Sequence, residues 1–155
     1  MLKAVVPSLS EMNFRQMLLS DEQTMSYNKR WGGIIPFLES EWNEWYRVWV
    51  SGNSKERYYR YLYSVELETF VGEIAYHYDQ QHKVYIINII IKAEFRGHGF
   101  GREGLVLLMQ SAKGNGIEAL CDTIAIDNPS IALFQELGFI EKWRNEAFVM
   151  LEKQL

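Results

Sequence analysis

A glycine-rich segment in the middle of the chain has the residue types needed to bind an anion. "FRGHGFGREG", residues 95–104, places four glycines between positions 97 and 104, after the apolar run 84–91 and before the helix-like "LVLLMQSAK". Glycine lets backbone N–H groups approach a ligand closely, because no Cβ intervenes. The first N–H groups of a helix lack intrahelical partners and lie at its positive dipole end. The segment therefore predicts a phosphate or pyrophosphate site.

Three interpretations of this segment compete. Residues 99–104 match G-x-G-x-x-G, the dinucleotide-binding pattern, with Asp122 or Asp127 near the expected ribose-binding acid. However, the rest of the chain is too short for the paired βαβαβ halves of that fold, and a P-loop is excluded because no Gly-Lys-Ser/Thr follows. The second interpretation is a glycine-rich turn without a ligand. The third comes from a family resemblance.

The segment resembles the first signature of the GNAT (Gcn5-related) N-acetyltransferases. Arg96 to Gly101 match R/Q-x-x-G-x-G/A, and "NIIIKAEFRGHGFG" is similar to the strand and loop around that signature. Further on, "NPSIALFQELGF" (128–139) resembles the second signature, a helix ending in Leu-Gly-Phe. Two signatures in the right order are more specific than either alone, so we favour this interpretation. The resemblance extends from about residue 70 to 140.

The resemblance implies an acetyl-CoA-dependent N-acetyltransferase that acts on a primary amine. Backbone amides of the loop would cradle the pyrophosphate, and the end of the preceding strand would pair with the pantetheine arm. The implied cofactor-binding residues are Ile89, Ile90, Ile91, Arg96, Gly97, His98, Gly99, Phe100, Gly101 and Arg102. The side chains of Arg96 and Arg102 either add charge or are ordinary surface arginines, and only the backbone of His98 need matter.

The sequence departs from the family pattern at two positions of the second signature. Phe134 stands where the family often has a tyrosine that protonates the departing thiolate. A thiolate, with a pKa near 8.5, can leave without an acid, or another tyrosine or water can replace the donor. Asp127 stands where the family usually has an asparagine, and Asn128 follows it. Either residue would contact the pantetheine, or Asp127 is a helix N-cap.

A general base must remove a proton from the acceptor's ammonium group. Glu73 in "FVGEIAYHY" is the best candidate, with His77 on the same strand face as a weaker one; the alternative for Glu73 is a solvated strand residue. His82 lies in a predicted turn and is expected on the surface. No second His or Cys has ligand spacing, so we expect no metal site. Cys121 lies in an apolar strand and is expected to be buried core.

An aromatic segment in the first third is expected to frame the acceptor. Tyr27 and Trp31, in a loop near two glycines, are the candidates for the pocket wall. Trp42, Trp45 and Trp49 recur at helical spacing and form either a core stripe, which we favour, or part of that wall with cation–π contacts. Acidic residues beside them would favour a cation: Glu39, Glu41 and Glu44. The acceptor is a small-molecule or peptide amine. The rival function is a domain of the same fold that senses acetyl-CoA or binds a protein partner.

Periodicity predicts the elements that position these residues. A short strand at residues 2–6 precedes helical segments at 10–29 and 38–49, a tyrosine-rich strand at 59–67, and strands at 70–78 and 84–91. A helix after the glycine loop, a strand at 118–126, a helix at 129–137 and one or two closing strands complete the chain. This order predicts one α/β domain over residues 1–155. By the resemblance, its mixed, mostly antiparallel sheet has a splayed central strand pair and flanking helices.

Composition limits the function classes. The 155 residues are 48% hydrophobic and 23% charged, as in globular proteins, and a net charge of -4 argues against a nucleic-acid binder. No apolar run approaches a membrane span, and the start "MLKAVVPSLSEM" does not resemble a signal peptide. A single cysteine gives no disulfide framework. We therefore expect a cytoplasmic protein without membrane partner, with a homodimer left open.

Overall fold

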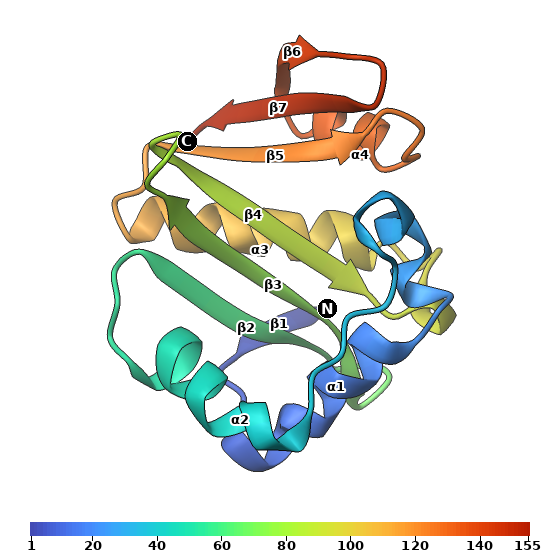
Figure 1. Cartoon of the computed structure of the whole chain (residues 1–155), viewed down its shortest axis with the longest axis vertical. Helices are drawn as coiled ribbons and strands as arrows, with labels where there is room; N and C mark the ends of the chain where they lie inside the picture. Colours follow the sequence, from blue (N-terminus) through green and yellow to red (C-terminus); the bar gives the residue numbers. More distant parts are fainter.

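A computed structural model describes the whole chain, residues 1–155. Seven strands form one sheet in the order β1-β2-β3-β4-β5-β7-β6 (Figure 1). The strands are β1 (Leu2–Val5), β2 (Arg57–Ser64), β3 (Thr69–Asp79), β4 (Val84–Ile91), β5 (Ala119–Ala125), β6 (Ile140–Arg144) and β7 (Phe148–Gln154). The helices are α1 (Met12–Ser20), α2 (Glu39–Tyr46), α3 (Phe100–Gly114) and α4 (Ile131–Glu136), with shorter helical turns η1 (Leu9–Glu11), η2 (Thr24–Trp31), η3 (Arg47–Ser51) and η4 (Ala93–Phe95).

The central strands β4 and β5 are the one parallel pair, and they diverge along their length. β4 pairs with β3 from Val84 to Ile91, whereas Ile86 opposite Cys121 is the only registered pair between β4 and β5. Beyond that pair, the β5-facing edge of β4 has no ladder partner, and Figure 1 shows the two strands separating. The other neighbouring strands are antiparallel. The predicted fold class is confirmed, including the splayed central pair and the flanking helices.

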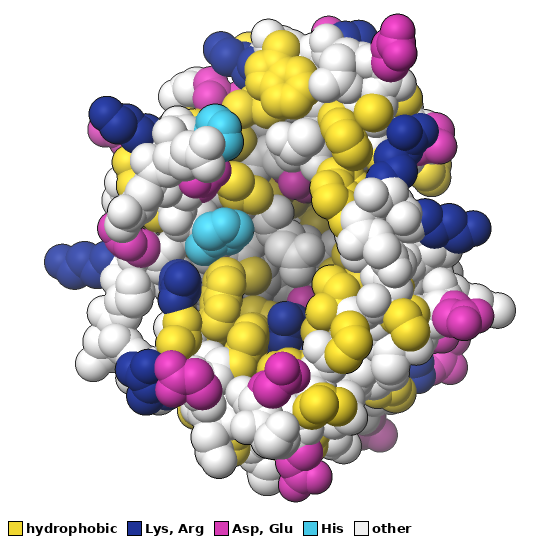
Figure 2. Space-filling model, in the orientation of Figure 1, with side chains coloured by type: hydrophobic (Ala, Val, Ile, Leu, Met, Phe, Trp, Pro, Cys, Tyr) yellow, Lys and Arg dark blue, Asp and Glu magenta, His cyan; other side chains and the backbone are white.

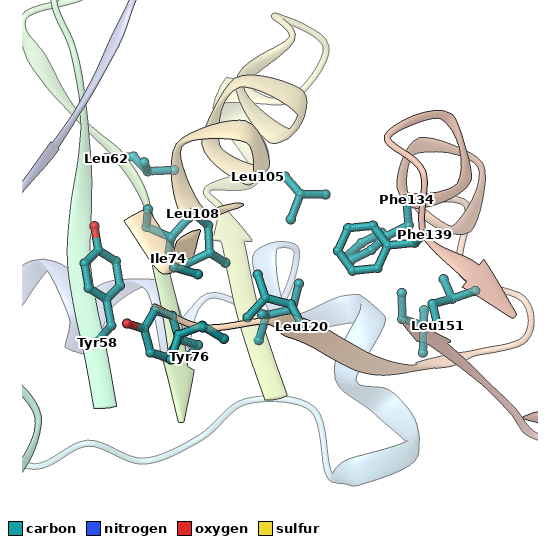
Figure 3. Close-up of a cluster of buried hydrophobic side chains, with 14 of the residues drawn as sticks. Tyr58, Leu62, Ile74, Tyr76, Leu105, Leu108, Leu120, Phe134, Phe139 and Leu151 are labelled. Atoms are coloured by element: carbon teal, nitrogen blue, oxygen red, sulfur yellow. The ribbon is translucent and has the colours of Figure 1, made fainter. Parts of the chain in front are cut away.

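Helices cover both faces of the sheet, as the apolar sequence of β4 requires. On one face, Leu105 and Leu108 of α3 are fully buried in a cluster that reaches from β2 to α4 (Figure 3). On the other face, a second cluster around Tyr59 and Tyr61 lies beneath α1 and α2. Trp42, Trp45 and Trp49 pack against this second cluster half-buried, so the predicted core stripe is confirmed.

Three predicted elements have different bounds in the structure. The helical segment 10–29 is interrupted after Ser20, and η2 continues as a 3-10 helix. The predicted helix 38–49 ends in the π-helical turn η3. The predicted strand 59–67 ends at Ser64, because the chain turns at Glu68, whose φ is 52°; Val65 and Leu67 are exposed rather than on the buried face. No helix is long and apolar enough to cross a membrane.

Candidate active site

A cleft of about 1180 Å³ runs between the splayed strands and onto the sheet face beneath α1, α2 and η2. Figure 2 shows this face hollowed at its centre, with hydrophobic side chains along the hollow and charged and histidine side chains around it. Most predicted site residues line the cleft: Tyr27, Trp31, Glu73, His77, Ile89, Ile90, Ile91, Arg96, Gly97, Gly99, Phe100, Gly101, Arg102, Asp127, Asn128 and Phe134. His98 is not among its lining residues. Sequence segments far apart in the chain therefore share one cavity.

The glycine loop presents unpaired backbone donors at the end of this cleft. Gly97 and Gly99 have φ of 83° and 81°, the left-handed region, and a Cβ at either would meet open space. The N–H groups of Gly97, His98 and Gly99 make no hydrogen bond within the chain, and α3 begins at Phe100. Unpaired N–H groups beside a helix N-terminus form a cradle for an anion.

Gly104, the last glycine of the loop segment, has a different role. A Cβ on Gly104 would lie 2.8 Å from Leu62 Cδ1 and 3.1 Å from Ile89 Cδ1, because α3 crosses the sheet closely there. Gly101 is helical, and its Cβ would make an ordinary contact with Leu133 at 3.5 Å. Gly97 and Gly99 therefore keep the backbone of the loop open, and Gly104 serves helix–sheet packing.

Side chains of the loop are occupied by other contacts. Arg96 donates hydrogen bonds to the carbonyl oxygens of Gln23, at 3.3 Å, and Thr24, at 2.7 Å. The Ala93 N–H donates to the Thr24 hydroxyl at 3.0 Å, so the loop is tied to η2. Arg102 forms an ion pair with Glu136. The main chain is therefore the part of the loop free to bind a ligand.

Glu73 is not a solvated strand residue. Its side chain is fully buried, and Arg15 Nη1 lies 2.9 Å from each of its carboxylate oxygens. The Tyr59 hydroxyl and Asn88 Nδ2, at 3.2 Å, also donate to this carboxylate. Because three donor side chains already occupy this carboxylate, its surroundings favour a structural role over proton abstraction.

Asp122 of β5 is a second carboxyl in the cleft, and sequence reasoning considered it only as a ribose-binding acid. Burial raises the pKa of Asp122 from 3.8 to about 8, while a hydrogen bond from the Thr123 N–H lowers it. No basic side chain forms an ion pair with Asp122, in contrast to Glu73. An unpaired carboxyl with a pKa near neutrality is suited to act as a general base. In the sequence, this role was indicated only by the position of an acidic residue inside the apolar run "ALCDTIAI".

Tyr27 of η2 lines the cleft with its phenolic side chain. Burial raises the pKa of Tyr27, and the charges of Glu73 and Asp122 raise it further, so the phenol keeps its proton. Phe134 also lines the cleft, but its ring is buried against Phe139 and donates nothing. Tyr27 therefore offers the hydroxyl that position 134 lacks.

Asp127 and Asn128 differ in role at the start of α4. Asn128 Oδ1 accepts a hydrogen bond from the Ser130 N–H at 2.9 Å, so Asn128 supplies the turn before the helix. Asp127 does not cap α4; it is exposed and pairs with Arg30 of η2 at 3.6 Å. The alternative of an Asp127 N-cap is therefore wrong. Instead, the ion pair between Asp127 and Arg30 links two walls of the cleft.

The acceptor half of the cleft is aromatic, as expected, but the acidic residues of α2 do not face it. The Trp31 ring lies tilted against Phe148, with ring centres 4.9 Å apart, and His77 packs edge-to-face on Trp49 at 5.8 Å. Burial and the nearby Arg57 lower the pKa of His77. The acidic residues of α2 do not line the cleft: Glu39 is exposed, Glu41 accepts from the Leu38 N–H, and Glu44 pairs with Arg47. The expectation that they attract a cation is wrong.

Cys121 is buried, as expected for a core residue. Burial and the neighbouring Glu152 carboxylate raise the pKa of the thiol to about 12. The protonated thiol points its hydrogen at Glu152, with Sγ 3.5 Å from the carboxylate oxygen. A thiol held in this form is a poor nucleophile. No group of three or more His, Cys, Asp or Glu side chains is arranged to hold a metal ion.

The fold therefore combines a splayed parallel strand pair with a glycine loop whose backbone N–H groups are unpaired at its open end. The chain belongs to the acetyltransferase (GNAT) family, whose model matches residues 18–139. No curated protein sequence matches the chain at a significant level.

Solved structures have similar folds at low sequence identity. The spermidine N-acetyltransferase from Vibrio cholerae, in complex with CoA and spermine, superposes with a TM-score of 0.80 at 19% identity, covering 99% of this chain and 95% of that one. A domain from Methanocaldococcus jannaschii gives 0.77 at 20% identity, covering 100% and 99%. A GNAT-family acetyltransferase from Bacillus anthracis gives 0.76 at 14% identity, covering 99% and 94%. These similarities establish the fold.

Proposed function

We propose that the protein transfers an acetyl group from acetyl-CoA to a primary amine, by direct attack of the amine in a ternary complex. The proposal rests on one observation: two features suited to the reaction lie in the same cleft. Unpaired N–H groups of the glycine loop lie at one end, and the unpaired carboxyl of Asp122 lies beside the open edge of β4. The Vibrio cholerae structure with CoA and spermine supports the same co-substrate and an amine acceptor.

Backbone groups would hold the donor. The N–H groups between Arg96 and Arg102 would bind the pyrophosphate at the N-terminus of α3. The edge of β4 from Ile89 to Ile91, which lacks a β5 partner, would hydrogen-bond to the amide groups of the pantetheine arm. Asp127 and Asn128, at the mouth of the gap, would flank this arm.

Side chains of the cleft would move the protons. Asp122 would accept a proton from the acceptor's ammonium group, directly or through one water. The neutral amine then attacks the thioester carbonyl carbon, forming the C–N bond, and an N–H of the open β4 edge would donate to the developing oxyanion. The nitrogen, which carries a positive charge after the attack, would lose its second proton to water. When the C–S bond breaks, Tyr27 would donate its proton to the departing thiolate and regain one from solvent, and Asp122 would release its proton to solvent. Glu73 and His77 would shape the acceptor side.

A second candidate function is acetyl-CoA sensing without turnover. The buried Phe134 favours it, because the residue that often protonates the thiolate is absent from this position. In this case the loop would bind acetyl-CoA, and the acceptor half of the cleft would contact a protein partner.

Calorimetric titration with acetyl-CoA, followed by thiol release with a panel of amines, separates these functions. Acetyl-CoA at 100 times its dissociation constant should stabilise the protein by about 2.7 kcal/mol, because only the folded loop binds it. Turnover with an amine supports the transferase, and binding without turnover on any amine supports the sensor. No binding contradicts both, and a larger stabilisation by NADH would support a dinucleotide site.

We also propose that residues 1–155 act as one acetyltransferase domain, since one sheet contains strands from Leu2 to Gln154. A cytoplasmic location is supported by the single cysteine, and the net charge of -4 argues against nucleic acid as a partner.

A further inference from the structure

The acceptor half of the cleft is built around a buried arginine. Arg15 of α1 reaches toward β3 and packs on three aromatic rings: its Cζ lies 4.2 Å from the ring centre of Trp45, 5.0 Å from Phe37 and 5.5 Å from Tyr59. Its side chain is 16% exposed, and that exposed part lines the cleft. The aromatic cage that could hold an acceptor's ammonium group is therefore already filled by a cation of the chain itself.

One edge of the Arg15 guanidinium has no partner. Nη1 makes both hydrogen bonds to Glu73, each 2.9 Å long. Nε is buried and has no hydrogen-bond partner. Nη2 also makes no hydrogen bond within the chain, but it is not buried, and Arg15 lines the cleft. A buried donor without a partner is uncommon and calls for an explanation. Nη2 is therefore the donor atom of Arg15 that a carboxylate in the cleft can reach, with a charge-assisted hydrogen bond.

The charges around the cleft disfavour a polyamine acceptor. Five basic side chains line it: Arg15, Lys29, Arg30, Arg96 and Arg102. Three acidic side chains line it: Glu73, Asp122 and Asp127. Glu73 and Asp127 are each paired with an arginine, so neither is free to bind a second ammonium group. Arg15, Arg30 and Arg102 are paired with carboxylates as well. Lys29 and Arg96 then remain against Asp122, and this small excess of positive charge favours an anionic group on the acceptor over a polycation.

The surroundings of Arg15 also define what else the acceptor carries. Trp45 and Trp49 stack on each other at 5.8 Å, and both line the cleft with Ala75 and His77 of β3. This wall offers apolar and aromatic surface to a side chain rather than further hydrogen-bonding groups.

We propose that the acceptor is a free α-amino acid with an apolar or aromatic side chain, whose carboxylate binds Nη2 of Arg15. Trp45 and Trp49 form the wall against which its side chain packs. Arg15 is then a specificity-determining residue, and Glu73 is the positioning residue that holds it. This inference rests on the proposed transferase activity and names its substrate class.

The first test compares acceptors that differ only in the carboxylate. Thiol release from acetyl-CoA is measured with L-tryptophan against tryptamine, with L-phenylalanine against phenethylamine and L-phenylalaninamide, and with spermidine. We expect kcat/KM to be at least tenfold higher for each amino acid than for its carboxylate-free counterparts. Faster turnover of tryptamine, phenethylamine or spermidine overturns the inference but leaves the transferase activity intact. Turnover of none of these amines contradicts the inference, and acetyl-CoA binding without turnover of any amine contradicts the proposed function as well.

The second test removes the Arg15 edge without leaving a buried charge unpaired. The double variant Arg15→Met/Glu73→Gln removes both charges together, and acetyl-CoA binding reports whether it folds. We expect the KM for L-tryptophan to rise at least tenfold more than the KM for tryptamine, because only L-tryptophan carries the carboxylate. Arg60→Met is the matched control, because Arg60 also packs on a tyrosine ring, at 4.5 Å from Tyr58, but lies outside the cleft. A double variant that keeps the parental preference overturns the inference; if it does not fold, the acceptor comparison alone decides.

Discussion

The two halves of the cleft bind by different means. The end near α3 presents main-chain N–H groups, which the left-handed glycines Gly97 and Gly99 leave open. The acceptor half presents side chains held by a buried network, in which Arg15 and Glu73 come from distant segments, α1 and β3. A main-chain site needs only a short sequence with the right backbone. A side-chain site depends on tertiary packing that one segment cannot specify.

Substitutions at Asp122 and Glu73 test this difference between the two halves most directly. Asp122→Asn has the largest expected effect. As general base, Asp122 should contribute about 10²–10⁴-fold to kcat. Because its pKa is about 8, kcat of the parent should rise with pH and level above 8, and the variant should show no such rise. Initial rates from pH 5 to 9 measure both effects. A variant with more than a tenth of parental kcat would contradict the assignment.

The raised pKa of Asp122 also predicts a pH-dependent change in the stability of the protein. Its folded-state pKa, about 8, lies above the ordinary value of 3.8, so the folded protein holds a proton that the unfolded chain has lost between these values. Parental stability should therefore fall as pH rises through this window. The melting temperature of Asp122→Asn should exceed that of the parent by more at pH 8 than at pH 5. An equal difference at both values would show that the pKa of Asp122 is not raised in the folded protein.

Glu73→Gln should affect stability more than chemistry. It leaves the buried Arg15 guanidinium without its counter-ion, and breaking a buried pair costs about 3–5 kcal/mol. We expect this loss in chemical denaturation, with kcat of the folded fraction within tenfold of the parent. If kcat instead falls a hundredfold while stability is unchanged, Glu73 is the base, and the contrast between the two carboxyls is wrong.

Two glycines of one loop separate ligand binding from packing. Gly99→Ala should weaken acetyl-CoA binding about tenfold, or about 1.4 kcal/mol, because its backbone has a φ of 81° that alanine disfavours. Gly104→Ala should instead lower stability by about 1–3 kcal/mol through contact with Leu62 and Ile89. Its affinity for acetyl-CoA, measured by calorimetry, should stay within twofold. The opposite pattern would mean that Gly104 faces the ligand and that Gly99 is only a turn residue.

The same contrast explains how much the sequence could predict. The apolar run 84–91 and the glycines after it predicted the central strand, the loop and the start of α3, because each signal is local. Asp122 carried only a weak local signal, since its raised pKa comes from burial beside other strands. The sequence gives no signal for Arg15, because an arginine in a helical segment is expected on the surface. Its aromatic surroundings come from α2, β2 and the residues before α2, which are distant in the sequence.

Tyr27→Phe has the smallest expected effect, and it tests the segment that joins the two halves. η2 carries Tyr27 into the cleft, while Thr24 and Arg96 tie it to the glycine loop. If the Tyr27 phenol protonates the thiolate, kcat should fall, but less than tenfold, because a thiolate with a pKa near 8.5 can leave without an acid. The loss should be greatest with a donor whose leaving group is more basic, since such a group needs the proton more. Comparing acetyl-CoA with an oxygen ester analogue of it, in parent and variant, measures this dependence. An equal loss with both donors would assign Tyr27 to acceptor positioning, and the departing thiolate would then be protonated by water.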